Sequence, residues 1–287
     1  MRRSRLPLGK AVPLLLLLGG TLPAAGGAGT LANDQRASGK RGAVVTAHPI
    51  ASQVGLEVLE KGGNAVDSAV AVFFALVLAV VHPQAGNLGG GGFMVARLMG
   101  AIRQESPREI ALDFREVAPH RAERDMYLDE RGKVVPGASL HTALAAGVPG
   151  SVAGICRAHE LYGTLPFRDL LAPAIRLAEE GIEVDSFLHR AIAAKRKRFL
   201  AWRSTARIFL PGGKPPPVGS VFKQPELGKT LRRIARHGRD GFYRGETAGL
   251  IEREMQRSGG LIDREDLAAY EVKERKPLEG SYRGYRV

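Results

Sequence analysis

The only cysteine of this 287-residue chain, Cys156, is the first candidate nucleophile. His159 follows it at a spacing that places both side chains on one face of a helix, as a nucleophile and its base would require. That face also carries Val152 and Ile155, and a lone cysteine among apolar residues usually packs as a small hydrophobe. We therefore interpret the face as core. A single cysteine also forbids an intramolecular disulfide.

Ser151 is the second candidate nucleophile, because it lies between small residues after Gly150. A G-x-S-x-G nucleophile elbow requires glycine two residues before the serine, and position 149 is proline. The motif is therefore absent at Ser151.

The densest glycine cluster, at positions 86 and 89–92, is a candidate phosphate loop. Such loops follow a strand and open a helix, so that helix N–H groups face the phosphates. Here the pattern predicts a helix before the glycines and a strand, Phe93–Leu98, after them. Counting G-x-G-x-x-G from Gly89 reaches Met94, and Gly228-Lys229-Thr230 lacks the upstream glycine of a P-loop. We expect structural glycines, which permit a positive φ or a close approach of another backbone.

The histidines form no pattern typical of a metal site or of any cofactor. The seven stand at positions 48, 82, 120, 141, 159, 189 and 237. We therefore expect neither a metal nor a cofactor.

Composition indicates a globular protein with an excess of positive charge. The chain is 44% hydrophobic, and its formal net charge of +13 favours acidic partners. Its densest basic cluster, from Arg190 to Arg207, holds seven Lys and Arg and no acid. Only Phe199 and Trp202 interrupt it with aromatic rings, so we interpret it as a solvated helix face and expect no nucleic-acid partner.

The first 28 residues have the pattern of a secretory signal peptide. Met1–Lys10 carries four positive charges, five leucines follow at 14–18, and small residues occupy 22–29. We expect cleavage near Ala25–Ala28, a linker over 29–41 and one region over 42–287. The mature protein should be exported, periplasmic or extracellular, without a stable membrane span, although an uncleaved N-terminal anchor is an alternative.

The central element is the apolar run Ala69–Val81, which predicts a helix that is buried on every face. His82-Pro83 ends it, and it is shorter than the roughly 20 apolar residues of a membrane span. The strand Phe93–Leu98 should also be buried. The remaining pattern predicts an α/β or α+β fold. Expected helices are Ala51–Glu60, Ser151–Tyr162, Phe167–Glu180, Asp185–Arg198, Glu226–His237, Glu246–Ser258 and one starting at Asp263–Asp266. Other expected strands are Gly42–Ala47, Ile110–Phe114 and Glu279–Val287, the last without a partner.

Eight motifs resemble, in unbroken order, the large subunit of γ-glutamyltransferases. They are GGNAVDSAVAV, HPQAGNLGGGGFMV, DFREVAP, GVPGSVAG, YGTLPFRDLLAPAIRLAEEGIEV, GFYRGETAG, SGGLIDREDLAAYEV and GSYRGYRV. The resemblance implies an N-terminal-nucleophile hydrolase fold, a four-layer αββα sandwich. It also implies a precursor that cuts itself into large and small subunits, whose new N-terminal Thr attacks the γ-glutamyl amide of donors such as glutathione. Amino acids, peptides or water act as acceptors.

Arg115, in the DFREVAP motif, matches the arginine that holds the donor α-carboxylate in this family. A guanidinium suits that role because it pairs with a carboxylate through two parallel hydrogen bonds and stays charged. From the residues alone, an arginine between Asp113 and Glu116 would instead indicate a structural ion pair.

No segment of the chain resembles the family's self-cleavage site or the serines that support its oxyanion. The threonines at 46, 142, 164, 205, 230 and 247 all lie in the region that resembles the large subunit. We therefore expect an incomplete fold, no catalytic residue in this chain and no activity without the small subunit. Alternatives are a related acylase or amidohydrolase of the β-lactam acylase or poly-γ-glutamate type, and a non-catalytic exported protein that binds anions.

Overall fold

The computed structural model describes residues 39–40, 42–77, 88–99 and 108–287. It divides the chain into two units, Met1–Gly39 and Lys40–Val287, and all elements below belong to the second. The expected signal peptide 1–28 lies outside the described residues, as does the expected linker except for residues 39 and 40. None of the helices in the described part of the chain is long and apolar enough to cross a membrane.

The central helix is present, as the sequence predicts. Helix α2 (Ala65–Val77) covers the described part of the apolar run, whose residues 78–81 lie outside the described ranges. No residue from 66 to 76 is exposed, but Ala69, Val72, Phe73 and Leu76, which share one face of the helix, are only half-buried. The prediction of a helix buried on every face therefore holds only in part. Helix α1 (Pro49–Glu60) precedes it and begins where the His48 side chain accepts a hydrogen bond from the Ile50 amide.

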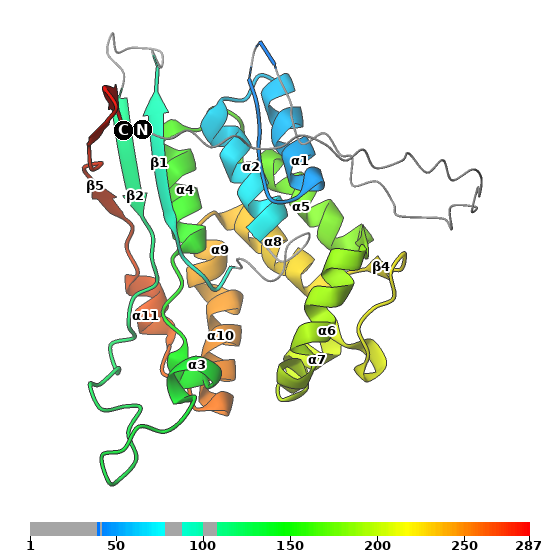
Figure 1. Cartoon of the computed structure of the whole chain (residues 1–287), viewed down its shortest axis with the longest axis vertical. Coiled ribbons are helices and arrows are strands. Elements are labelled where there is room, and N and C mark those ends of the chain that lie inside the picture. Colours follow the sequence, from blue (N-terminus) through cyan, green and yellow to red (C-terminus); the bar gives the residue numbers. More distant parts are fainter. Residues whose placement is uncertain (1–38, 41, 78–87, 100–107) are drawn as a thin grey trace, which may run out of the picture. The chain divides into compact units, whose positions relative to one another are not determined.

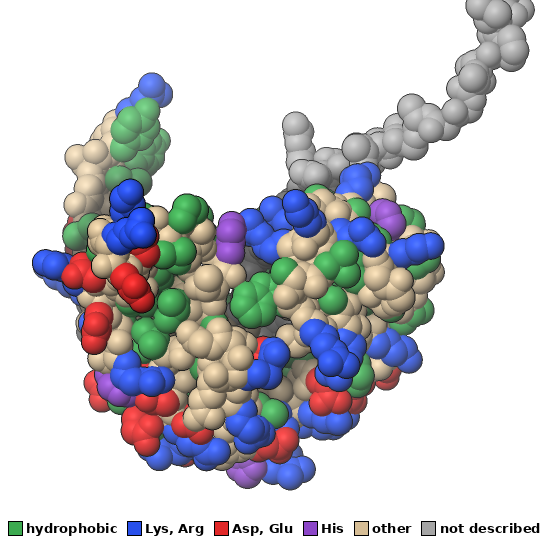
Figure 2. Space-filling model, turned by 90° about the horizontal axis from the view of Figure 1, so that it is seen from below, with side chains coloured by type: hydrophobic (Ala, Val, Ile, Leu, Met, Phe, Trp, Pro, Cys, Tyr) green, Lys and Arg blue, Asp and Glu red, His purple; other side chains and the backbone are tan. Residues whose placement is uncertain are grey.

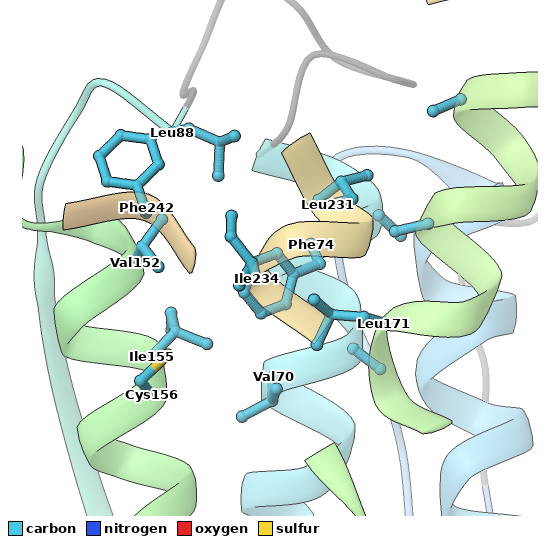
Figure 3. Close-up of a cluster of buried hydrophobic side chains, with 14 of the residues drawn as sticks. Val70, Phe74, Leu88, Val152, Ile155, Cys156, Leu171, Leu231, Ile234 and Phe242 are labelled. Carbon is cyan, nitrogen blue, oxygen red and sulfur yellow. The ribbon is translucent and has the colours of Figure 1, made fainter. Parts of the chain in front are cut away.

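Three further helices complete the core around α2 (Figure 3). They are α4 (Ser151–Tyr162), α5 (Phe167–Glu180) and α8 (Pro225–His237), and each agrees with its predicted range to within one residue. Val70 and Phe74 of α2 lie among Ile155, Leu171 and Ile234, all at most 2% exposed. Side chains from four segments far apart in sequence therefore form one apolar cluster.

A three-stranded antiparallel sheet lies beside α4 (Figure 1). Its order is β1-β2-β5, with β1 (Phe93–Leu98), β2 (Arg108–Asp113) and β5 (Lys273–Arg275). Met94 pairs with the buried Leu112 on the inner face, whereas Phe93 and Val95 on the outer face are 64% and 73% exposed. The prediction of a buried strand at 93–98 is therefore wrong for its outer face. Alternating side chains bury only the face that the helices cover.

Two other strand predictions are wrong. Residues 42–47 form no strand, and Val45 is 91% exposed, because no described strand lies alongside to complete a ladder. The predicted strand Glu279–Val287 is a hairpin of β6 (Ser281–Tyr282) and β7 (Tyr285–Arg286). Arg283 and Gly284 between them have φ values of 51° and 83°, the left-handed pair of a tight hairpin turn. The segment thus pairs with itself.

The remaining elements surround this core (Figure 1). The capping box of α11 between Asp263 and Asp266 confirms the predicted helix start. The predicted helices over 185–198 and 246–258 are also confirmed, as α6 and α10. The full set is α3 (Ala138–His141), η1 (Ala143–Ala145), β3 (Ile182–Glu183), α6 (Ser186–Leu200), α7 (Arg203–Phe209), η2 (Pro211–Gly213), β4 (Val221–Phe222), α9 (Asp240–Tyr243), α10 (Gly245–Ser258) and α11 (Arg264–Ala269).

A buried carboxylate joins α2 to the connection between α4 and α5. Asp67, fully buried, accepts hydrogen bonds from the Thr164 amide (2.9 Å), the Thr164 hydroxyl (2.5 Å) and the Asn64 amide (2.9 Å). Burial opposes ionisation of the carboxyl, but these hydrogen bonds outweigh it and lower the pKa of Asp67 below its usual 3.8. The carboxylate therefore stabilises the fold in its charged form.

Replacing Asp67 by Ala should lower the free energy of unfolding by about 2–4 kcal/mol, because several buried donors lose their acceptor. Since the pKa is lower in the folded state, the charge of Asp67 stabilises the fold above pH 3.8 and this contribution is lost as the pH falls further. Urea unfolding should accordingly show a difference between wild type and Asp67→Asn at pH 7 that shrinks below pH 3.8. The exposed Asp169→Asn is the control, and an equal effect of both Asn variants would contradict the assignment.

Candidate active site

Arg115 lies two residues beyond β2, where the strand has left the sheet. Its side chain is 64% exposed and its Nε lies 3.4 Å from Glu116 Oε2. Asp113 does not pair with this guanidinium, because its Oδ2 accepts a hydrogen bond from Arg275 Nε at 2.6 Å and its Oδ1 accepts one from the Arg115 amide. These contacts, the Arg115 amide first, hold the pKa of Asp113 below 3.8. One side of the Arg115 guanidinium therefore stays open.

The Arg115 side chain borders a cavity of about 700 Å³. The walls come from the loop after β2 and from the segment that precedes α4. The lining residues are Gly89, Arg115–Pro119, Ala122–Arg124, Met126, Tyr127 and Leu144–Gly147. This volume accommodates a small peptide, with a cation on its wall that can bind a carboxylate.

The glycine cluster packs against Phe114, at the start of the loop that follows β2, and against the start of α4. The Gly90 carbonyl accepts hydrogen bonds from the Gly150 and Ser151 amides at the start of α4, both at 2.9 Å. A Cβ on Gly91 would lie 2.6 Å from the Phe114 carbonyl oxygen. None of the glycines 89–92 has a positive φ. A close approach explains Gly91, and also Gly92, where a Cβ would lie 3.0 Å from the Phe114 ring. The prediction of structural glycines is supported at these two positions, while Gly86 lies outside the described residues.

The start of α4 is equally close to the Arg115 segment. A Cβ on Gly150 would lie 2.1 Å from both the Phe114 carbonyl oxygen and the Tyr270 hydroxyl. A Cβ on Gly154 would lie 2.1 Å from the Phe114 ring. The glycines of the GVPGSVAG motif therefore let α4 pack directly on the residue before Arg115.

Tyr270 also fixes the Arg115 backbone, a role that the sequence analysis missed. Its hydroxyl donates to the Arg115 carbonyl at 2.8 Å, and its ring stacks on Tyr243 with centroids 5.8 Å apart. The Tyr243 hydroxyl donates to the Pro149 carbonyl, and Arg239 donates to the Tyr270 carbonyl. Burial raises the pKa of Tyr270 to about 12, so the hydroxyl keeps its proton at neutral pH.

His120 ties the end of the same loop to α11. The His120 amide and Nδ1 both contact Asp266 Oδ1, at 2.8 and 2.9 Å, and Nε2 lies 3.6 Å from Asp263 Oδ2. The hydrogen bond to Asp266 raises the pKa of His120. These three side chains could face one cation, but Asp266 already accepts hydrogen bonds from His120 and from the Asp263 amide. The arrangement holds the loop, and only the Asp263–Asp266 spacing was visible in the sequence.

Most candidate nucleophiles in the described residues are buried or already hydrogen-bonded. Cys156 is buried, and burial raises the pKa of its thiol to about 12. Ser151 is 1% exposed at the start of α4. The hydroxyls of Thr46, Thr142, Thr164, Thr230 and Thr247 donate to backbone carbonyls or, for Thr164, to Asp67.

Comparison with solved structures identifies the fold. The structure matches crystal structures of Helicobacter pylori gamma-glutamyltranspeptidase (TM-score 0.83, 47% identity, 88% of this chain and 70% of that chain) and of the Bacillus anthracis transpeptidase CapD (TM-score 0.69, 34% identity, 87% and 75%). The fold is therefore that of an N-terminal-nucleophile hydrolase, of which the described residues contribute helices, one three-stranded sheet and two small two-stranded sheets.

The family follows from the sequence comparisons. The gamma-glutamyltranspeptidase family model matches residues 51–287. The chain is 46% identical to the glutathione hydrolase proenzyme of Escherichia coli (strain K12) over 86% of its length, and 39% identical to the acylase ACY 1 proenzyme of Pseudomonas sp. (strain SE83) over 88%. The chain belongs to the gamma-glutamyltranspeptidase family. It spans 42% and 45% of the length of these two relatives.

Replacing Tyr270 by Phe should lower the free energy of unfolding by about 1 kcal/mol, because it removes one hydrogen bond and keeps the stacked ring. Amide exchange should accelerate most in the segment around Arg115. Tyr282→Phe, at a ring that is 63% exposed, is the matched control. Unchanged exchange around Arg115 in Tyr270→Phe would show that this hydroxyl does not hold the loop.

Proposed function

We propose that this chain is the donor-binding part of an enzyme that transfers or hydrolyses γ-glutamyl groups of glutathione and related compounds. Amino acids, peptides or water serve as acceptors. The observation that carries the proposal is the exposed Arg115 guanidinium on the wall of the cavity, in a chain of this family. Its fixed positive charge and planar donors suit the α-carboxylate of a γ-glutamyl donor.

The nucleophile in this proposal comes from the small subunit of the same precursor. Support comes from the described side chains, since the thiol is buried and the hydroxyls of Thr46, Thr142, Thr164, Thr230 and Thr247 are engaged in structural hydrogen bonds. We assign to the small subunit the exposed outer face of the sheet, where Phe93 and Val95 present apolar side chains that a second layer would bury.

The purified 287-residue chain should release no product from a chromogenic γ-glutamyl donor, because under this proposal the small subunit supplies the nucleophile. The measurement compares the rate with that of a boiled sample. A rate above this background would reveal a nucleophile outside the described contacts and would overturn the division of roles between the two subunits.

In a complete protein that carries the small subunit, Arg115→Lys should lower kcat/KM for γ-glutamyl donors about tenfold or more. Lysine keeps the charge but loses the two-bond geometry with the carboxylate. A donor without the α-carboxylate should respond little, because it never used this anchor.

Arg124→Lys is the matched control, since Arg124 borders the same cavity but is 90% exposed and pairs with Asp125. Equal loss with both donors in a well-folded Arg115→Lys protein would make Arg115 a structural ion-pair residue.

A second candidate function is that of an acylase, favoured by the 39% identity to the acylase ACY 1 proenzyme. Under this alternative, the complete protein would cleave acyl side chains that carry no α-amino acid group. The two donors of the Arg115 experiment separate the functions, because an acylase would prefer the donor without the α-carboxylate.

A further inference from the structure

The segment Ser186–Pro225, called here the basic segment, has an unusual charge composition. It holds nine Lys and Arg and no Asp or Glu, within a chain whose net formal charge is +13. The structure folds this segment into α6, α7, η2 and β4. Most of the net charge of the protein is therefore concentrated in 40 consecutive residues.

The charges of the basic segment lie on the surface and form no close ion pair with the described carboxylates. All nine cations are exposed, and none forms an ion pair within 4.0 Å in the part of the chain that the structure describes. Arginines elsewhere pair readily, as Arg232 does with Glu179 and Arg264 with Glu252. The segment thus keeps its positive potential at the surface.

On helix α6, the cations and the packed apolar side chains lie on different sides. Leu188, Ile192 and Phe199 lie on the side that packs against the protein, whereas Arg190 and Lys197, seven residues apart, lie together on the exposed side. In Figure 2 the side of the molecule that α6 and α7 form carries several groups of Lys and Arg with few carboxylates among them. A solvated helix face, as first interpreted, explains the exposure but not the absence of acids.

Exposed aliphatic side chains lie among these cations. Leu200, Ile208, Val218 and Val221 are 45%, 38%, 57% and 61% exposed. Base stacking would need several free aromatic faces, but the rings of Phe199, Phe209 and Phe222 pack on one another with centroids 5.4 and 5.6 Å apart. Phe187, 48% exposed, is the single aromatic residue among the large exposed apolar side chains of the segment. Cations with aliphatic neighbours suit a lipid headgroup region better than a nucleic acid.

We propose that the basic segment binds the surface of a membrane rich in anionic phospholipid. Its Lys and Arg contact the phosphate groups, and its exposed aliphatic side chains enter the boundary between headgroups and acyl chains. Each cation near such a surface contributes independently, so the interaction should be strong in low salt and weak in high salt. The proposal concerns a face without Arg115 and is independent of the γ-glutamyl chemistry.

The test measures sedimentation of the purified chain with vesicles of phosphatidylcholine alone or mixed with phosphatidylglycerol. Binding is expected only to the mixed vesicles. The triple variant Lys195→Gln, Lys197→Gln and Arg203→Gln should lower the partition constant on the order of a hundredfold. A matched triple variant at exposed cations elsewhere, Arg131→Gln, Lys133→Gln and Lys276→Gln, changes the net charge equally and should bind almost as wild type.

Three outcomes would overturn the proposal. Equal losses in the two triple variants would show a response to net charge alone. Binding to duplex DNA without binding to the mixed vesicles would make the basic segment a nucleic-acid surface. Binding to neither would leave a solvated face. Circular dichroism of both variants excludes unfolding as the cause of a loss.

Discussion

The approach of the Gly90–Gly92 backbone to Phe114 is the constraint on which the candidate site depends. Gly92 exchanges two hydrogen bonds with Phe114, and Gly90 accepts two from the start of α4. A single methyl group at Gly91 or Gly150 would lie within 2.6 Å of the Phe114 carbonyl oxygen. Three segments that are distant in sequence therefore meet with no side chain between them. Arg115 is the next residue of the chain after Phe114, so this contact fixes where it begins.

The sequence predicts the helices of this fold better than its strands. Helices were readily predicted because their apolar spacing and glycine or proline ends are local signals, as for α5 between Pro166 and Gly181. Strand predictions depended on partners that the pattern does not specify. Residues 42–47 contain three β-branched residues, which favour strands, yet no described strand lies beside Val45, and the residues after Glu279 pair with themselves.

The candidate site, too, could be predicted only in part from the sequence. Arg115 could be found because its motif resembles a known family, whereas its supports could not. Tyr270 lies 155 residues away in sequence, and Asp266 lies 146 residues from His120. A tyrosine after a short helix carries no local sign that its hydroxyl will meet a particular carbonyl. Contacts of this kind are set by tertiary packing, and only the structure identifies them.

The contrast between the backbone and the side chain of Arg115 bears on its role. The carbonyl is held by Tyr270, and the next residues are held by the Val117–Val148 bridge and by His120, so the Cα position is fixed. In the part of the chain that the structure describes, the side chain pairs only with Glu116, at 3.4 Å and with most of its surface exposed, a contact of small energetic value. A purely structural arginine would be expected to bury its charge-assisted hydrogen bonds, as Arg239 does against Tyr270. A cation with a rigid base and unsatisfied donors is better suited to binding an anion that arrives from outside.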